Sequence, residues 1–211
     1  MELNPVLLRE HAATIIEFNQ FLADKNYNGD RQDMEICVGN LLYDLLEKWS
    51  SHNQTLVDWK DAVSEYMDDV ILIYSYNAAT SVILQILLNK DGIFLEMGIE
   101  CPKNLPLMPD DFWQQWTELS SFGNFELSEN EVFSGQKEKQ FPELFPASTS
   151  NIFRLMRNLI AFPILYERSI DWGTVSIGWP YEQFSIKEVF EKGNLAFERL
   201  CHLNTRLRAG K

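Results

Sequence analysis

The hydrophobic residues of the first half of the chain recur at intervals of three and four, the spacing of one helix face. The first helix is predicted from Asn4 and Pro5 to about Ala23, because asparagine is a favoured N-cap and proline suits the first helical position. A second helix is predicted over residues 34–49, and a third from residue 56 to a break at 77–80, with a further helical stretch to residue 89. Long amphipathic segments joined by short polar turns predict an antiparallel bundle.

Hydrophobic residues alternate after the Asp91-Gly92 turn signal, so residues 93–99 are predicted to form a half-buried strand. Prolines at positions 102, 106 and 109 predict extended chain, and a short helix is predicted over residues 110–119. Residues 121–147 are predicted to be a long acidic loop with at most one weak strand.

The last part of the chain is predicted to contain a helix from Ser150 to about Pro163, a strand over residues 174–179 and a final amphipathic helix. Ser185 and Glu188 have the spacing of a capping box and would start that last helix. Gly193 lies inside it at a cost of about 1 kcal/mol relative to alanine, which indicates close backbone contact there.

The predicted fold class is therefore mainly α (α+β), an antiparallel helical bundle with a small two- or three-stranded sheet. Whether the strands near 93–99 and 174–179 pair with each other is left open. The 211 residues are expected to form a single domain. Possible sub-units are an acidic helical bundle over 1–120 and a helix-strand-helix unit over 148–211, joined by the acidic loop 121–147.

Composition limits the function classes. With 45% hydrophobic and 23% charged residues the chain has the composition of a packed soluble protein, and its net charge of −13 argues against nucleic-acid binding. The N-terminal residues lack the pattern of a secretory leader, so a cytoplasmic location is expected. The three separated cysteines, Cys37, Cys101 and Cys201, are predicted to be buried free thiols.

One segment, residues 70–89, is uncharged and as long as a membrane span. Its eight polar side chains would be costly in lipid, so it is predicted to be a covered core element rather than a membrane span.

Charge is distributed unevenly along the chain. Residues 1–150 carry 25 acidic and nine basic side chains, whereas residues 151–211 carry six acidic and nine basic ones. The acidic excess indicates either a surface for a basic partner or a basic C-terminal unit that docks on the acidic remainder. The basic cluster that would dock consists of Arg154, Arg157, Arg199, Arg206 and Arg208.

Catalytic motifs are scarce. His11, His52 and His202 have no metal-site or catalytic-triad spacing, and there is no glycine-rich phosphate loop. Two carboxylate pairs, Asp44-x-x-Glu47 and Glu65-x-x-Asp68, have a helical spacing that would suit Mg²⁺.

The stretch EYMDDVILIY around the second pair resembles the acidic helix of the all-α nucleotide pyrophosphohydrolases. The resemblance implies a Mg²⁺-dependent enzyme whose ligands come from an ExxE helix followed by an ExxD helix, here Asp44, Glu47, Glu65 and Asp68. Asp44 departs from the pattern, which has Glu at that position. Helical geometry also turns Glu47, Glu65 and Asp68 away from the apolar stripes of their predicted helices.

Aromatic and acidic residues gather in the short helix predicted over 110–119. Trp113 and Trp116, beside Asp110, Asp111 and Glu118, form a candidate partner-binding surface, because binding hot spots favour tryptophan and complementary charge speeds encounter. Alternatively, both tryptophans are core residues.

The leading hypothesis is a non-catalytic protein-binding module without a cofactor. It would mask a basic partner in the manner of immunity proteins and antitoxins. The alternatives are the Mg²⁺-dependent pyrophosphohydrolase-like enzyme and a subunit of a larger assembly, and the oligomeric state is left open.

Overall fold

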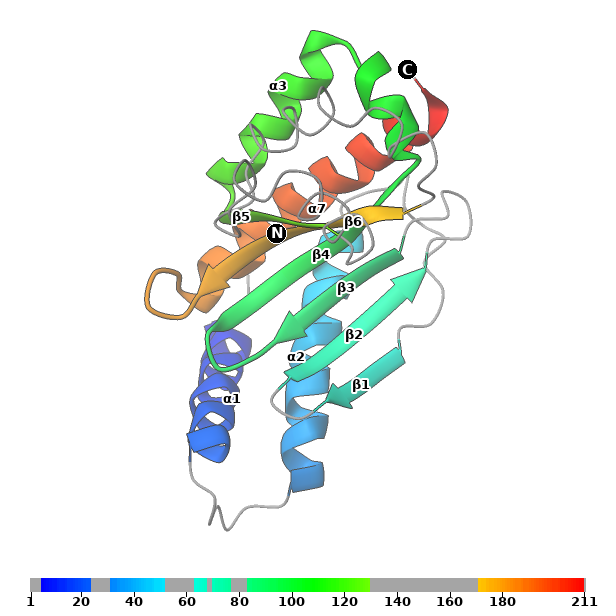
Figure 1. Ribbon diagram of the computed structural model, residues 1–211. Helices are drawn as coiled ribbons and strands as arrows, with labels where there is room; N and C mark the ends of the chain where they lie inside the picture. Colours follow the sequence, from blue (N-terminus) through cyan, green and yellow to red (C-terminus); the bar gives the residue numbers. More distant parts are fainter. Residues whose placement is uncertain are drawn as a thin grey trace, which may run out of the picture. The chain divides into compact units, whose positions relative to one another are not determined.

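A computed structural model describes residues 5–23, 31–51, 63–67, 70–76, 83–129 and 171–210 (Figure 1). In chain order these residues form α1 (Pro5–Ala23), α2 (Arg31–Ser51), β1 (Val63–Met67), β2 (Val70–Tyr76), β3 (Ile83–Leu88), β4 (Gly92–Glu100), the 3-10 helix η2 (Pro102–Leu107), α3 (Asp110–Glu118), the 3-10 helix η3 (Leu119–Ser121), β5 (Asn124–Glu129), β6 (Asp171–Pro180) and α7 (Ile186–Ala209).

The chain divides into two compact units. Unit 1 comprises Met1–Leu95 and Gly178–Glu198, and unit 2 comprises Glu96–Ile177 and Arg199–Lys211. Strands β4 and β6 and helix α7 each contribute residues to both units.

The sheet has six strands in the order β1-β2-β3-β4-β6-β5 (Figure 1). Strand β2 is antiparallel to both β1 and β3, with Glu65 opposite Leu72 and Tyr74 opposite Gln85. The predicted fold class, a helical bundle with two or three strands, is therefore wrong, because the segments 63–67, 70–76 and 83–88 are strands where helices were predicted.

Segment 63–67 was predicted to be helical from the three-and-four spacing of its hydrophobic residues, whereas for β2 and β3 the cause of the error is their uncharged apolar character. Side chains of both strands that lie on one face of the sheet are buried, and helix α2 packs against the same two strands. Ile71, Ile73 and Ile86 are at most 2% exposed. Periodicity alone does not show whether a continuous apolar run is a buried strand or a buried helix. The β-branched and aromatic residues of this run favour the strand.

Other predictions are confirmed. Residues 93–99 and 174–179 lie in strands β4 and β6, which are neighbours in the sheet, and the predicted helices near 5–23, 34–49, 110–119 and 186–207 are α1, α2, α3 and α7. Residues 102–107 form η2 instead of extended chain. The helix predicted from Ser150 and most of the loop 121–147 lie outside the described residues, although β5 occupies residues 124–129.

In unit 1, helix α7 begins with the predicted capping box. The backbone N–H of Ser185 donates to Glu188 Oε2 at 2.9 Å, and the backbone N–H of Glu188 donates to Ser185 Oγ at 3.3 Å. Further along α7, a Cβ on Gly193 would overlap the ring of Trp49, and Trp49 Nε1 donates to the carbonyl of Phe190 at 3.1 Å. The close contact expected at Gly193 is thus present, and it fixes α7 against α2.

In unit 2, the second half of α7 is held to the remainder by amide side chains. Asn204 Nδ2 donates to the carbonyl of Gly98 at 3.0 Å, and Asn104 Nδ2 donates to the carbonyl of Leu207 at 2.8 Å. The fully buried side chains Leu105, Phe112 and Leu119 contribute to the core of this unit.

None of the described helices combines the length and apolar character that crossing a membrane requires. The three cysteines are free thiols, but only Cys201 is buried, and Cys37 is exposed on α2, so the expectation of three buried thiols is wrong.

Candidate functional site

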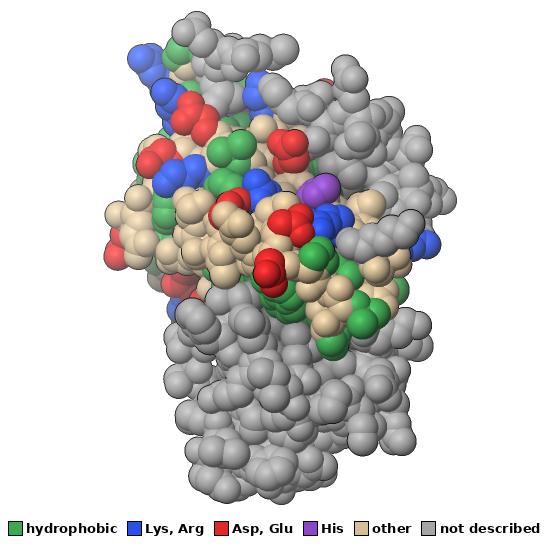
Figure 2. All heavy atoms as spheres, turned by 90° about the horizontal axis from the view of Figure 1, so that it is seen from above, with side chains coloured by type: hydrophobic (Ala, Val, Ile, Leu, Met, Phe, Trp, Pro, Cys, Tyr) green, Lys and Arg blue, Asp and Glu red, His purple; other side chains and the backbone are tan. Residues whose placement is uncertain are grey.

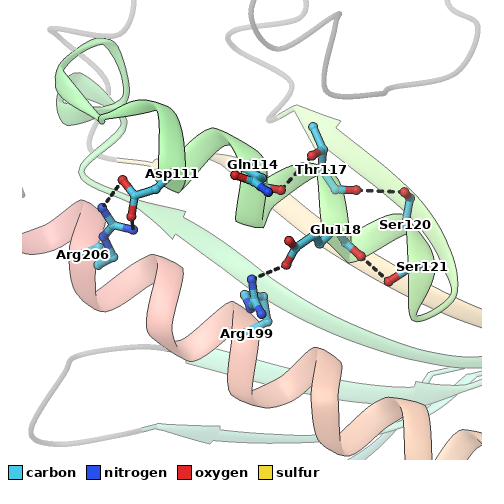
Figure 3. A network of polar contacts seen from close by, with 8 residues as sticks. All are labelled: Asp111, Gln114, Thr117, Glu118, Ser120, Ser121, Arg199 and Arg206. Atoms are coloured by element: carbon cyan, nitrogen blue, oxygen red, sulfur yellow. Dashed lines mark hydrogen bonds and ion pairs between the residues drawn. The ribbon is translucent and has the colours of Figure 1, made fainter.

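The predicted partner-binding residues lie on α3 in unit 2. Asp110 and Asp111 occupy its first turn, where carboxylates interact favourably with the positive end of the helix dipole. Asp111 accepts two hydrogen bonds from Arg206 of α7, at 2.8 Å from Nη1 and 3.1 Å from Nη2 (Figure 3). The hydrogen bond from Arg206 is the main cause that holds the pKa of Asp111 below its ordinary value.

The other end of α3 is paired in the same way. Glu118 Oε2 accepts a hydrogen bond from Arg199 Nη1 at 2.6 Å (Figure 3). For Arg199 and Arg206, the prediction that basic residues of the last helix pair with the acidic part of the chain is therefore confirmed. The view of Figure 2 agrees, because acidic and basic side chains are interspersed among the described residues rather than separated by sign.

The two tryptophans of α3 differ in exposure. Trp116 is only 3% exposed and its ring centroid lies 5.4 Å from that of Phe112, so it belongs to the core of unit 2. Trp113 is half-buried and contacts both rings. The structure therefore brings Asp110, Asp111, Trp113, Trp116 and Glu118 onto one short helix, but two of their carboxylates already have arginine partners. A partner role for this set stays a prediction.

The alternative metal ligands are not brought together among the described residues. Asp44 and Glu47 lie on α2, where Glu47 is exposed as helical geometry predicted. Glu65 lies on strand β1, and Asp68 lies outside the described residues. The acidic helix that carried the resemblance to pyrophosphohydrolases is replaced by β1 and β2. The part of the chain that the structure describes contains no group of three or more His, Cys, Asp or Glu that could hold a metal.

A contact between His11 and Asp44 was not predicted from the sequence. His11 of α1 is 6% exposed, its Nε2 lies 3.0 Å from Asp44 Oδ2, and its ring stacks on Phe190 at 5.7 Å. Burial lowers the pKa of His11 below its ordinary value, although Asp44 and Glu10 act in the opposite direction. The residues come from three distant segments, so no local spacing could have revealed the pair.

A half-buried carboxyl lies on the sheet of unit 2. Burial raises the pKa of Glu96 on β4, a hydrogen bond with Ser176 on β6 opposes the rise, and the charge of Glu126 on β5 adds to it. These three strands are adjacent in the order β4-β6-β5. Glu96 is thus poised to take up a proton more readily than an exposed glutamate, and its polar position within an alternating strand is the signal that could have flagged it.

Helices α1 and α2 of unit 1 expose both apolar and acidic side chains. Six large hydrophobic residues are exposed in the described part of the chain, and four of them are on these two helices: Val6 at 57%, Ile16 at 60%, Ile36 at 53% and Tyr43 at 39%. Exposed carboxylates on the same helices are Glu10, Glu17, Asp33 and Glu47. These apolar residues lie off the buried stripe of each helix, a sequence signal that can be used only once the packing of α1 on α2 and of α2 on β2 and β3 is known.

Within the part of the chain that the structure describes, the outer faces of α1 and α2 therefore combine exposed large hydrophobic residues with exposed carboxylates. Protein-recognition surfaces use this combination. Comparison with family models, curated proteins and solved structures found no match to this chain.

Proposed function

We propose that this protein is a non-catalytic binding module that masks a basic partner, in the manner of immunity proteins and antitoxins. We propose further that its contact surface is formed by the outer faces of α1 and α2. The observation that carries the proposal is the concentration of exposed large hydrophobic residues among exposed carboxylates on these two helices.

The helix pair has the support that a recognition surface needs. Helix α1 packs on α2, and α2 packs on β2 and β3. His11 links the pair further, since it contacts Asp44 of α2 and stacks on Phe190 of α7. Fixed elements lose little conformational freedom on binding, which favours affinity.

Charge supports the same assignment. The three carboxylates Glu10, Asp33 and Glu47 are exposed on the outer sides of α1 and α2, whereas on α3 Asp111 and Glu118 pair with arginines of the same chain. A basic partner approaching α3 would have to compete with Arg199 and Arg206. At α1 and α2 it would meet carboxylates that attract it over a distance of about a Debye length.

The proposal is tested by affinity purification from the native host at low ionic strength, followed by binding measurements with the purified partner. We expect a basic protein whose affinity falls at least about tenfold between about 50 mM and about 500 mM salt. Recovery of no partner, or of a partner whose affinity does not depend on salt, contradicts the proposal.

A charge-matched pair of triple variants locates the surface within unit 1. Neutralising Glu10→Gln, Asp33→Asn and Glu47→Gln is expected to slow association about tenfold or more, because it removes the attraction at the contact surface. The control removes the same number of exposed carboxylates from outside α1 and α2 and is expected to have a much smaller effect. Its members are Asp91→Asn, Glu182→Gln and Glu198→Gln, all exposed in unit 1.

A further inference from the structure

We infer that the part of the partner recognised by α1 and α2 is a basic amphipathic helix that lies lengthwise along their outer faces. This inference rests on the proposed function and specifies the chemistry of the partner. It follows from the spacing of the exposed apolar residues, from the charges beside them and from the length of the two helices.

A subset of the exposed residues of each helix forms a straight stripe. On α1 the exposed positions 6, 9, 13, 16 and 20 are separated by alternating threes and fours, and on α2 so are positions 33, 36, 40, 43 and 47. This is the spacing with which one helix offers a continuous seam to another. Each stripe spans 15 residues, or about 20 Å, which is enough for about four turns of a partner helix.

Apolar anchors distinguish these stripes from an ordinary solvated helix surface. Val6 and Ile16 lie on the α1 stripe, and Ile36 and Tyr43 lie on the α2 stripe. Helix α7, which is longer, exposes one large hydrophobic residue, Leu195, along its described length. Two anchors per stripe, about two or three turns apart, match the i, i+7 or i, i+10 periodicity of an apolar helix face.

The charge beside the anchors determines which kind of helix fits. Asp33 and Glu47 lie on the α2 stripe, one turn from Ile36 and Tyr43. The α1 stripe itself carries Arg9, with the exposed carboxylates Glu10 and Glu17 beside it, so exposed carboxylates outnumber the exposed arginine around the anchors. A partner helix therefore needs lysine or arginine on both sides of its apolar stripe. A second copy of this chain, docked by the same surface, would place carboxylates opposite carboxylates, and a nucleic acid would place phosphates there, so repulsion disfavours both.

The probe for this inference is a synthetic peptide of about 18 residues made of leucine and lysine, with its leucines at i, i+3, i+4 and i+7. A control peptide has the same composition in an order that destroys the apolar face, and a second control replaces lysine by glutamate. We expect the first peptide to bind and to gain helicity, measured by fluorescence anisotropy and circular dichroism. The shuffled peptide should bind at least about tenfold more weakly, and the glutamate peptide should not bind.

Matched variants tie the binding to the anchors. The double variant Ile16→Gln and Ile36→Gln removes one anchor from each helix, and its control, Leu195→Gln and Leu107→Gln, removes two exposed leucines elsewhere. Glutamine keeps good helix propensity, so the fold is expected to survive in both, which thermal unfolding verifies. We expect the first pair to weaken peptide binding about tenfold and the second to leave it unchanged.

The outcomes separate this inference from the proposed function. Equal binding of the amphipathic and shuffled peptides, or equal losses in both double variants, overturns the helical partner. The proposed function then stands if a folded basic protein still binds in a salt-dependent way that the charge variants of α1 and α2 weaken. If neither the peptides nor a basic protein bind at low salt, the proposed function fails as well.

Discussion

Both halves of helix α7 bury apolar side chains, Phe197 in the first and Leu203 and Leu207 in the second, but they differ in their further contacts. Residues 186–198 belong to unit 1, where α7 fits by shape: Gly193 leaves room for Trp49, and the Trp49 ring also contacts Phe197. Residues 199–209 belong to unit 2, where Arg199 and Arg206 pair with carboxylates of α3. One continuous helix thus combines an apolar contact with little tolerance for change and a set of partly exposed ion pairs.

This difference matters for function because it separates the carboxylates that pair with arginines of the same chain from the carboxylates that stay exposed. In unit 2, arginines of the same chain balance two carboxylates that looked available to a partner. In unit 1, the first half of α7 helps to fix α1 and α2, through Phe190 and Trp49, while the carboxylates on their outer sides stay exposed. A count of acidic residues therefore does not locate a binding surface, whereas their pairing does.

The largest effect is expected from Gly193→Ala. The new Cβ would overlap the buried Trp49 ring and displace the indole from its hydrogen bond with the Phe190 carbonyl. Overpacking at a site that cannot relax outweighs the gain in helix propensity, so we expect a loss of about 3 kcal/mol in the free energy of unfolding. Urea unfolding, followed by tryptophan fluorescence and circular dichroism, measures it.

Gly39→Ala is the matched control on α2. Gly39 is also a buried glycine inside a helix of unit 1, but a Cβ there meets no atom within 4 Å. The variant should be more stable than the parent by up to about 1 kcal/mol, because alanine is the better helix former. Similar effects of the two substitutions would contradict the assignment of a shape-determined contact to the first half of α7.

The next effect is the protonation of His11, because a charge is more costly in a buried site than on the surface. Burial lowers the pKa of His11 from its ordinary value of 6.5. The unfolded chain then binds this proton more readily than the folded one, so stability is full above pH 6.5 and is lost as the pH falls below it. Urea midpoints measured from neutral to mildly acidic pH test this expectation.

Two variants isolate the histidine from the other titrating groups. His11→Gln should unfold with a weaker dependence on pH in this range, since the buried titrating group is gone. Asp44→Asn should strengthen the dependence, because it removes the carboxylate that favours the charged imidazole. A parent protein and a His11→Gln variant with the same pH profile would show that His11 does not contribute.

A smaller effect is expected at the start of α7. Ser185→Ala removes the side-chain oxygen that accepts from the Glu188 backbone N–H, at a cost of about 1 kcal/mol in the free energy of unfolding. Ser185→Thr keeps the acceptor and should retain most of the stability. Thermal unfolding of the two variants compares them directly, and a Ser185→Ala variant as stable as the parent would mean that the cap does not stabilise the first half of α7.

Elements with a local sequence signal, such as α1 and the start of α7, were predicted correctly, whereas elements that depend on distant contacts were not. Helix α1 was predicted between its observed ends, because Pro5 at its start is a local feature, and the capping box located the start of α7. Strands β2 and β3 were missed because an uncharged apolar run carries no periodicity that distinguishes buried strand from helix. Tertiary contacts with α2 decided the outcome there.

The candidate site was less predictable for the same reason. The pairing of Asp111 with Arg206 joins residues 95 positions apart, and the fold that aligns them is not encoded by spacing within α3. The pattern therefore placed the partner surface on α3, although Trp116 is buried there. The exposure of Ile16 and Ile36 could have been inferred from their positions opposite the buried stripes, but only with the packing of α1 on α2 and of α2 on β2 and β3 known.

The smallest effect is expected in the second half of α7, from Asp111→Asn, because Asp111 is 61% exposed and water and salt screen its pairing with Arg206. The hydrogen bond from Arg206 lowers the pKa of Asp111 below 3.8. The stabilisation is therefore present above pH 3.8 and is lost as the pH falls through the lowered pKa of the folded state. Urea midpoints of parent and variant should differ slightly at neutral pH and converge in strong acid or high salt. A difference that persists under both conditions would mean that Asp111 stabilises this half of the helix by something other than its charge pairing with Arg206.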